Sequence, residues 1–395
     1  MGTVLTPPPL GLYVHLPWCI QKCPYCDFNS HALRGDLPES DYIGALLRDA
    51  DTEATRVTGR RVETIFIGGG TPSLFSAEAI TRLLRGLEER LSIAADAEVT
   101  LEANPGTLEA GRFEGFLDAG VNRLSMGVQS FNDEHLRRLG RIHGGHEARR
   151  AVEAAQRAGF ERINLDLMHG LPEQSSEQAL ADVDQALALG IHHLSHYQLT
   201  LEPGTAFHAR PPALPDEDRL ADIEAACAAR IAAGRLQRYE VSAWATPGEE
   251  CRHNLNYWGF GDYLAIGAGA HGKVSHADGR IQRYSKLRMP RQYQTHAGTP
   301  AAIAGTRVVT MDERPLEYLM NALRLTAGVP VRDALARTGL TPAAFEPALS
   351  EARAQGLMVE DPAWLQATAR GQRFLDDLLG RFLDTTPGDA EVRSG

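Results

Sequence analysis

The sequence lacks any apolar segment long enough to cross a bilayer, and it shows no secretory signal. No stretch approaches the roughly 20 apolar residues that a membrane helix needs. The segment from Met1 to Leu10 has neither the basic region nor the apolar region from which such a signal is built. We therefore expect a protein of the cytoplasm that has no transmembrane segment.

An excess of positive charge is also missing. Lys and Arg number 40 against 51 Asp and Glu, which gives a formal net charge of −11 over 395 residues. Surfaces that bind nucleic acid are built from clustered cations, so this balance opposes a broad one. With 43% apolar and 23% charged residues, the composition is that of an ordinary globular chain. We expect a folded protein that has no nucleic-acid partner.

Cysteine is scarce, and its distribution is uneven. The chain has five cysteines, whereas a disulfide framework needs more of them in a shorter, secreted chain. Three of them, Cys19, Cys23 and Cys26, form a C-x3-C-x2-C segment directly after a β-rich run. Thiolates at this spacing can converge on one metal centre, and three ligands on a four-iron cube leave one iron open. The alternative is a zinc site completed by His15 or His31, although the chain has no second C-x2-C.

Short β-rich runs alternate with helical stretches up to about residue 240. Several of these runs are mostly apolar, as strands covered on both faces should be. This alternation predicts a parallel sheet with right-handed crossovers. Six units are too few to close an eight-stranded barrel, so we predict an α/β fold with an incomplete (β/α)6 barrel that is open on one side. The predicted strands are Leu12–Leu16, Val62–Ile67, Glu98–Glu102, Arg123–Val128, Arg162–Leu167 and His193–Thr200.

The C-terminal part of the chain has a different pattern. Helices near Pro315–Leu325 and Pro342–Gln355 precede β runs around Leu357–Glu360 and Trp364–Thr368, and another helix starts at Gln372. This order suggests a winged-helix-like α+β module. Ten Arg, no Lys and thirteen Asp or Glu after residue 305 give it no basic surface for DNA, so we expect a packing or lid role. The predicted domains are residues 1–240 for the barrel, 241–305 for an extension in which Gly259–Gly272 is irregular, 306–385 for this module and 386–395 for a disordered tail.

The cysteine segment, together with further motifs, resembles a known superfamily. The C-x3-C-x2-C spacing with the aromatic Tyr25 before the last cysteine is similar to the signature of radical S-adenosylmethionine proteins, and Gly68–Gly70 is similar to their GGG motif. Over nearly its whole length, the chain resembles HemW-like haem chaperones in the coproporphyrinogen-dehydrogenase-like branch. The segments that carry this resemblance are PWCIQKCPYCDF, GGGTPS, EANPG, GVQS, LGRIH, NLDLMHGLP and HNLNYW.

The resemblance implies two cofactors and a set of residues that hold them. Cys19, Cys23 and Cys26 would bind a [4Fe–4S] cluster, with S-adenosylmethionine at the open iron. Carboxylates can accept hydrogen bonds from ribose hydroxyls, and an arginine can pair with the methionine carboxylate. Any one of these residues alone could simply satisfy loop backbone, but the set follows successive strand ends. The positions that match the family's S-adenosylmethionine site are Tyr13, Gly69, Gly70, Thr71, Glu102, Gln129, Arg141 and Asp166.

The HNLNYW segment, residues 253–258, resembles the haem-associated motif of HemW-like proteins. Its His253 is the candidate haem ligand, because imidazole is a common axial ligand of haem iron. The alternative is a purely structural role, in which the histidine forms local hydrogen bonds and Tyr257 and Trp258 pack against their neighbours. Other histidines that could serve as the ligand are His192, His193, His196 and His271.

One position departs from the pattern of the coproporphyrinogen dehydrogenases. These enzymes carry a further cysteine two residues after the third cluster ligand, and this chain has Phe28 there. The departure puts their oxidative decarboxylation in doubt and leaves open whether the chain is an enzyme. The resemblance therefore favours a haem chaperone that passes haem to acceptor proteins and has an electron donor for its cluster. The alternatives are an oxygen-independent coproporphyrinogen III oxidase and a zinc-stabilised, non-catalytic binding protein.

Overall fold

A computed structural model describes residues 5–106 and 111–383 of the chain. The disordered tail predicted for residues 386–395 lies outside the described residues. Within the described residues, the chain has no helix that combines the length and the apolar character needed to span a bilayer.

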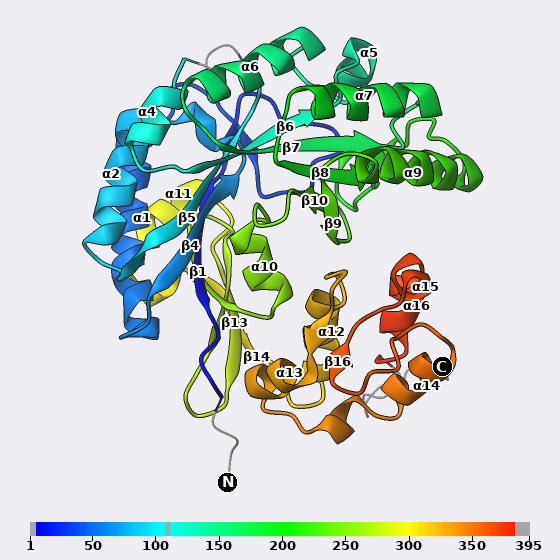
Figure 1. The fold of residues 1–395 in the computed structure, drawn as a ribbon. Helices are drawn as coiled ribbons and strands as arrows, with labels where there is room; N and C mark the ends of the chain where they lie inside the picture. Colours follow the sequence, from blue (N-terminus) through cyan, green and yellow to red (C-terminus); the bar gives the residue numbers. More distant parts are fainter. Residues whose placement is uncertain (1–4, 107–110, 384–395) are drawn as a thin grey trace.

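A single large sheet organises the molecule, and its centre is the predicted parallel sheet (Figure 1). All six predicted strands form and pair in parallel with their neighbours in chain order. The sheet has 12 strands in the order β14-β13-β12-β11-β1-β4-β5-β6-β7-β8-β10-β9, and its two edge strands do not pair with each other in the described part of the chain. The predicted open barrel is therefore confirmed, within a longer sheet. Its six central strands are β1 (Leu10–Leu16), β4 (Val62–Gly69), β5 (Ile93–Ala103), β6 (Arg123–Gln129), β7 (Arg162–His169) and β8 (His193–Gln198).

The expectation of irregular structure over Gly259–Gly272 is wrong. This segment contributes β11, which adds a seventh parallel strand beside β1, and the first residues of β12. Gly267 has a φ of 107° and Gly269 a φ of 78°, so these two glycines form the turn between β11 and β12. The strands beyond the predicted six are β9 (Gln237–Glu240), β10 (Ala243–Ala245), β11 (Asp262–Ile266), β12 (His271–Ser275), β13 (Ile281–Lys286) and β14 (Ile303–Val308).

Helices cover the outer face of the sheet, whereas α10 lies on the inner side (Figure 1). The apolar residues of the central strands and of the covering helices form one buried cluster. The strand ends on the inner side are therefore left free to carry polar groups. The helices before the C-terminal module are α1 (Glu39–Ala54), α2 (Ala77–Glu88), α4 (Phe113–Asp118), α5 (Asp133–Arg138), α6 (Gly145–Arg157), α7 (Ser176–Ala188), α8 (Ala206–Ala209), α9 (Glu217–Ala232), α10 (Arg252–Trp258) and α11 (Pro290–His296).

The C-terminal module has its own buried cluster, which Phe260 and Ile281 of the extension join. The predicted hairpin is only partly correct. Trp364–Leu365 (β16) pairs with Val329–Pro330 (β15), and a single bridge joins Met358 to Ala367. The prediction missed β15 and the helix that follows it. The helices of the module are α12 (Arg314–Ala322), α13 (Val331–Thr338), α14 (Ala348–Ala354), α15 (Ala369–Arg373) and α16 (Leu375–Gly380).

Polar contacts fix the module against the sheet. The Arg283 guanidinium of β13 pairs with Glu317 of α12 at 2.5 Å, and Arg324 pairs with Glu240 of β9 at 2.9 Å. These contacts come from both ends of the sheet, so the module closes one side of the open barrel.

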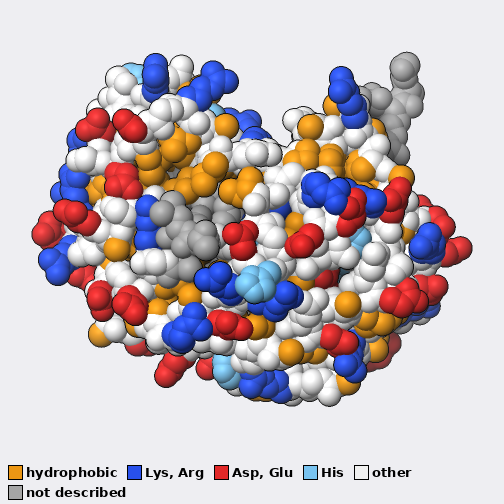
Figure 2. Space-filling view, turned by 90° about the horizontal axis from the view of Figure 1, so that it is seen from above, with side chains coloured by type: hydrophobic (Ala, Val, Ile, Leu, Met, Phe, Trp, Pro, Cys, Tyr) orange, Lys and Arg blue, Asp and Glu red, His pale blue; other side chains and the backbone are white. Residues whose placement is uncertain are grey.

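On the face shown in Figure 2, basic and acidic side chains are interspersed.

Candidate functional site

The three clustered cysteines lie on the loop after β1. Trp18–Cys19 (β2) pairs in parallel with His31–Ala32 (β3), which closes the loop at its base. Cys19, Cys23 and Cys26 are free and partly exposed. Burial raises the pKa of the Cys19 thiol, hydrogen bonds with Thr71 and Ser30 oppose the rise, and the charges of Cys26 and Cys23 add to it. Cys19 thus interacts with both other thiols, so the structure brings the predicted trio into one neighbourhood.

A buried arginine joins the cysteine loop to the strand ends. Arg141 lies 3.7 Å from Cys23 Sγ through Nη1, and its Nη2 donates to Asn104 Oδ1 at 2.8 Å and to the Gly127 carbonyl at 2.6 Å. Asn104 Nδ2 in turn donates to Thr71 Oγ1 at 3.1 Å. The Arg141 Nε atom is buried and has no hydrogen-bond partner. The unpartnered N–H can still donate to a ligand oxygen.

The glycine turn after β4 brings backbone close to the cysteine loop. Gly69 has a φ of 120°, a region that side chains rarely adopt, and its backbone N–H donates to Glu102 Oε2 at 3.0 Å. A Cβ atom on Gly70 would lie 2.6 Å from the carbonyl oxygen of Trp18, the residue before the first cluster cysteine. The turn can lie this close to the cysteine loop because Gly69 and Gly70 have no side chains.

Substituting Gly70 by alanine is expected to displace the cysteine loop. The added methyl group meets backbone rather than a flexible side chain, and overpacking of this kind costs about 1–3 kcal/mol. Urea denaturation should show the loss of stability, and cluster reconstitution should show a lower iron yield. Gly380→Ala is the matched control because a Cβ there meets nothing within 4 Å. Equal stability and equal iron yield in the two variants would contradict this account of the turn.

Two partly buried carboxyl groups, those of Glu102 and Asp166, lie at the strand ends. Burial and the charge of Asp166 together raise the pKa of Glu102 to about 7, although the Gly69 N–H opposes the rise. The pKa of Asp166 is also raised by burial, although Asn164 donates to it at 2.9 Å. Beside them, Gln129 has a φ of 70° and accepts a hydrogen bond from the Tyr197 hydroxyl at 2.9 Å. This end of the sheet therefore presents acceptors for ligand hydroxyl groups.

The raised pKa of Glu102 predicts a pH dependence of stability. The folded protein holds this proton up to about pH 7, whereas the unfolded chain releases it near 4.5. The free energy of unfolding should therefore fall as pH rises through that interval and then level off. A Glu102→Gln variant lacks this titration, so its stability relative to the wild type should increase across the same interval. Urea denaturation of the cluster-free proteins between about pH 5 and 8 tests this, and a constant difference would refute it.

A cavity of about 700 Å³ opens beside these residues, a size typical of sites for organic ligands. Tyr13, Gly69 and Glu102 border it on the sheet side, and Phe28 of the cysteine loop borders it as well. The opposite walls come from α10, from β11 to β14 and from Asn321 of α12. The cavity is therefore shared by the cysteine loop, the HNLNYW segment and the C-terminal module.

The HNLNYW segment lies in α10, and only part of it lines the cavity. Tyr257 and Trp258 line the cavity, and the ring of Tyr257 packs edge-on against Tyr263 with the centroids 4.6 Å apart. The indole N–H of Trp258 is buried without a hydrogen-bond partner, and Arg324 lies 4.3 Å above the indole ring. The motif thus supplies aromatic faces to the cavity.

His253 itself points into the protein. It is fully buried, its Nδ1 lies 2.8 Å from Thr64 Oγ1 and its Nε2 lies 2.9 Å from the Tyr257 hydroxyl. Its backbone N–H donates to Glu98 at 2.9 Å, and burial lowers the pKa of the imidazole to about 4. The structure therefore shows His253 as a neutral group that anchors α10 to β4 and β5, with both ring nitrogens engaged.

The sequence did not lead us to predict several of the residues that line the cavity. Tyr263, Ser285 and Arg288 line the cavity from β11, β13 and the turn after β13. They were missed because no strand was predicted in residues 241–305. The Asp278-Gly279 pair just before Ile281–Lys286 is typical of a hairpin turn, and it is a signal that could have found β13.

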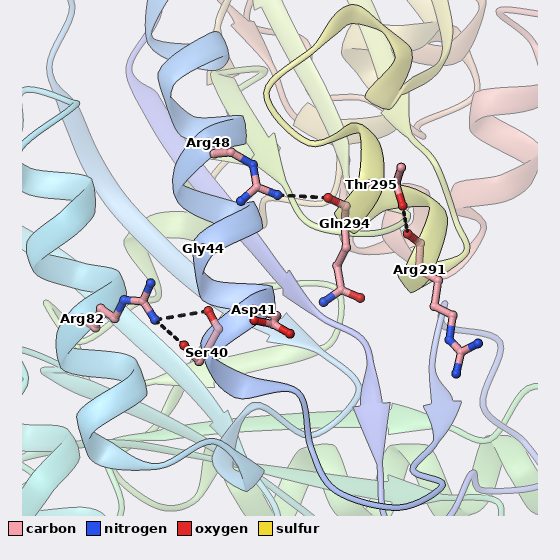
Figure 3. Close-up of a pocket in the computed structure, with 8 residues that line it drawn as sticks. All are labelled: Ser40, Asp41, Gly44, Arg48, Arg82, Arg291, Gln294 and Thr295. Carbon is pink, nitrogen blue, oxygen red and sulfur yellow. Dashed lines mark hydrogen bonds between the residues drawn. The ribbon is translucent and has the colours of Figure 1, made fainter.

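A second cavity, of about 650 Å³, lies on the outer side between α1, α2 and α11 (Figure 3). Arg48 reaches the Gln294 carbonyl at 3.0 Å across it, and Arg82 donates to Ser40 Oγ at 3.0 Å. Its walls contain none of the predicted site residues. The larger cavity instead contains Tyr13, Gly69 and Glu102 of the predicted S-adenosylmethionine site and Tyr257 and Trp258 of the haem motif in its walls, whereas the three cysteines and the other residues predicted for S-adenosylmethionine do not line it.

Comparison with known proteins agrees with this geometry. Residues 13–186 match the radical SAM superfamily, and residues 309–374 match the HemN C-terminal domain. The chain is 53% identical to the haem chaperone HemW of Escherichia coli, over 95% of this chain and 98% of that one. The chain belongs to the HemW family of radical SAM proteins. It is also 49% identical to the HemW of Haemophilus influenzae, over 95% of this chain and 98% of that one.

A solved structure supports the fold of this HemW-family chain. The coproporphyrinogen III oxidase HemN of Escherichia coli, a radical SAM enzyme, superimposes with a TM-score of 0.81 at 25% identity. The match covers 95% of this chain and 90% of that one. The predicted family is therefore confirmed, and the oxidase is a structural neighbour rather than the family to which the chain belongs.

Membership in the radical SAM superfamily implies a [4Fe–4S] cluster and S-adenosylmethionine. The donor set fits these cofactors, because three free thiols share a loop with a buried arginine beside them. His15 is not free to complete a zinc site, since its ring nitrogens contact the Tyr13 hydroxyl at 3.0 Å and the Asn29 carbonyl at 2.9 Å. The described residues hold no group of three or more His, Cys, Asp or Glu side chains arranged for a single metal ion.

Proposed function

We propose that this protein is a haem chaperone of the cytoplasm, which binds haem and passes it to acceptor proteins. The observation that carries the proposal is the shared cavity, which Tyr257 and Trp258 of the HNLNYW segment line together with Tyr13, Gly69 and Glu102. Full-length similarity to proteins named haem chaperone HemW supports it. Tyr257 and Trp258 offer aromatic surface for a porphyrin ring.

The cluster is proposed to be held by Cys19, Cys23 and Cys26. When bound and reduced by an electron donor, it supplies one-electron chemistry to S-adenosylmethionine at its open iron. The protein contributes the positions of the thiolates and of the charges around them. Arg141 fixes the loop through Cys23 and lowers the cost of holding negative charge there.

The S-adenosylmethionine site is proposed to lie between the glycine turn and the strand ends. Arg141 is placed to pair with the methionine carboxylate, and Gly69 and Gly70 provide the close approach of backbone that an amino group needs. Glu102 and Asp166 provide acceptors for ribose hydroxyls. The complete proposed set is Tyr13, Gly69, Gly70, Thr71, Glu102, Gln129, Arg141 and Asp166.

The proposed function is tested by titrating ferric haem into the anaerobically reconstituted protein and then adding an apo-haem acceptor. We expect saturable binding at one haem per chain and transfer of that haem to the acceptor. Replacing Tyr257 and Trp258 with alanine removes the aromatic walls and should weaken haem binding. Phe207→Ala is a control, because Phe207 is an aromatic residue that packs on Tyr25 and does not line the cavity.

Two results would contradict the proposal. The wild type could fail to bind haem, or the reconstituted protein could convert coproporphyrinogen III under reducing conditions with S-adenosylmethionine. The second result would make the protein an oxidase despite Phe28.

A further inference from the structure

Only one imidazole at the large cavity has ring nitrogens that are free of hydrogen bonds. Among the fourteen histidines, all within the described residues, His15 and His271 line the cavity. The ring of His15 is held at both nitrogens by Tyr13 and Asn29. His271 is exposed at the start of β12, and neither of its ring nitrogens has a hydrogen-bond partner in the structure.

The other candidate histidines are engaged elsewhere. His193 contacts Asn164 at 2.6 Å and the Tyr239 hydroxyl at 2.9 Å, and His196 is buried in a stack with His169 whose centroids are 4.5 Å apart. His192 lies 3.5 Å from Thr246 and does not line the cavity. His253 has both nitrogens occupied, as described above. Each of these would have to give up existing contacts before it could bind iron.

We infer that His271, rather than His253, is the protein ligand of the haem iron, and that Arg288 pairs with a haem carboxylate. This inference rests on the proposed haem-binding function and specifies its ligand. His271 pairs in register with Ser285 on β13, and both residues line the cavity together with Arg288, which follows that strand. Tyr257 and Trp258 stand on the α10 side of the same cavity, so they can contact the porphyrin while His271 reaches its metal.

The chemistry of the surroundings suits this role. Burial lowers the pKa of His271, and the charges of Arg288 and Arg283 lower it further. The imidazole is therefore neutral at neutral pH, which is the form that binds a metal. The Arg288 guanidinium is exposed and makes no hydrogen bond or ion pair in the structure, so it is available for a carboxylate.

The test titrates ferric haem into the wild type, His271→Ala and His276→Ala, followed by absorption and electron paramagnetic resonance spectra. His276 is a matched control on the same hairpin, where it contacts Gln282 at 3.1 Å outside the cavity. We expect His271→Ala to lose the histidine-ligated iron signal and to bind haem about tenfold more weakly. Free imidazole should restore the signal, and His276→Ala should match the wild type.

Arg288→Ala gives an independent arm. It should weaken the binding of haem but leave the iron signal unchanged, and it should not affect the binding of haem dimethyl ester, which lacks the free carboxylates. Circular dichroism checks the fold of each variant, and His271→Gln replaces the ring with a polar side chain if the alanine variant does not fold.

The outcomes separate the two proposals. A wild type that binds no haem removes the proposed function and this inference together. Haem binding with an unchanged iron signal in a folded His271 variant removes only the inference. Loss of the signal in a folded His253→Ala variant, with His271→Ala unchanged, would instead assign the iron to the motif histidine.

Discussion

Replacing Cys19, Cys23 and Cys26 together with alanine is expected to abolish cluster binding. The three thiols lie on one loop, where Cys19 interacts with both of the others. Three protein thiolates are the whole protein contribution to a cluster with one open iron, so nothing remains to retain it. After anaerobic reconstitution and desalting, the variant should contain neither iron nor sulfide.

Cys227→Ala is the control for this experiment. Cys227 is buried on α9 and does not contact the cysteine loop in the structure, so its replacement should leave the iron and sulfide content at the wild-type level. Full iron and sulfide content in the triple variant would place the cluster elsewhere. Zinc in the wild type, without iron or sulfide, would support a zinc-stabilised protein instead.

Substituting Lys286 by methionine is expected to lower the free energy of unfolding by about 3–5 kcal/mol. The Lys286 ammonium lies 2.7 Å from Asp49 Oδ1 and 2.7 Å from Glu53 Oε1, and all three side chains are at most 1% exposed. Burial raises the pKa of Asp49 even though Lys286 and the Tyr293 hydroxyl favour its charged form. Removing the cation leaves the buried Asp49 carboxyl group with no positive charge beside it, whereas Glu53 stays paired with Arg56 at 3.1 Å. It also removes the two ion pairs that join β13 to α1.

Equilibrium urea denaturation measures this effect, with two controls. Arg280→Ala breaks an exposed pair with Asp278, and its loss should leave the stability almost unchanged because solvent screens exposed ion pairs. The triple variant Lys286→Met, Asp49→Asn, Glu53→Gln removes all three charges and should recover much of the stability, because no carboxylate is left unpaired. If the Lys286 and Arg280 variants were equally stable, the contacts of Lys286 with Asp49 and Glu53 would not stabilise the fold as described.

The parallel centre of the fold could be predicted because its strands are short apolar runs separated by helical stretches. Val62–Ile67 and Arg162–Leu167 were found within two residues of the observed ends of β4 and β7. The strands of the extension were not predicted, because the glycines of residues 259–272 suggested irregular structure. In the fold, β11 (Asp262–Ile266) is a glycine-free run between these glycines, and it pairs with β1.

The candidate site was predictable where local spacing carries the chemistry. The cysteine trio and the glycine turn are short motifs, so the sequence showed them directly. The direction of His253 was not visible, since it depends on Thr64 and Glu98, which lie more than 150 residues away. The importance of His271 likewise depends on which histidines face the cavity, and only the folded chain shows this.

The central claim is that three cysteines hold a cluster whose fourth iron is open to S-adenosylmethionine beside the haem cavity. The most direct test is electron paramagnetic resonance of the reduced, reconstituted wild type before and after addition of S-adenosylmethionine, alongside iron and sulfide analysis. The account predicts about four iron and four sulfide per chain and a changed cluster signal when the nucleotide binds. A cluster signal that S-adenosylmethionine leaves unaltered at saturating concentration would contradict the account.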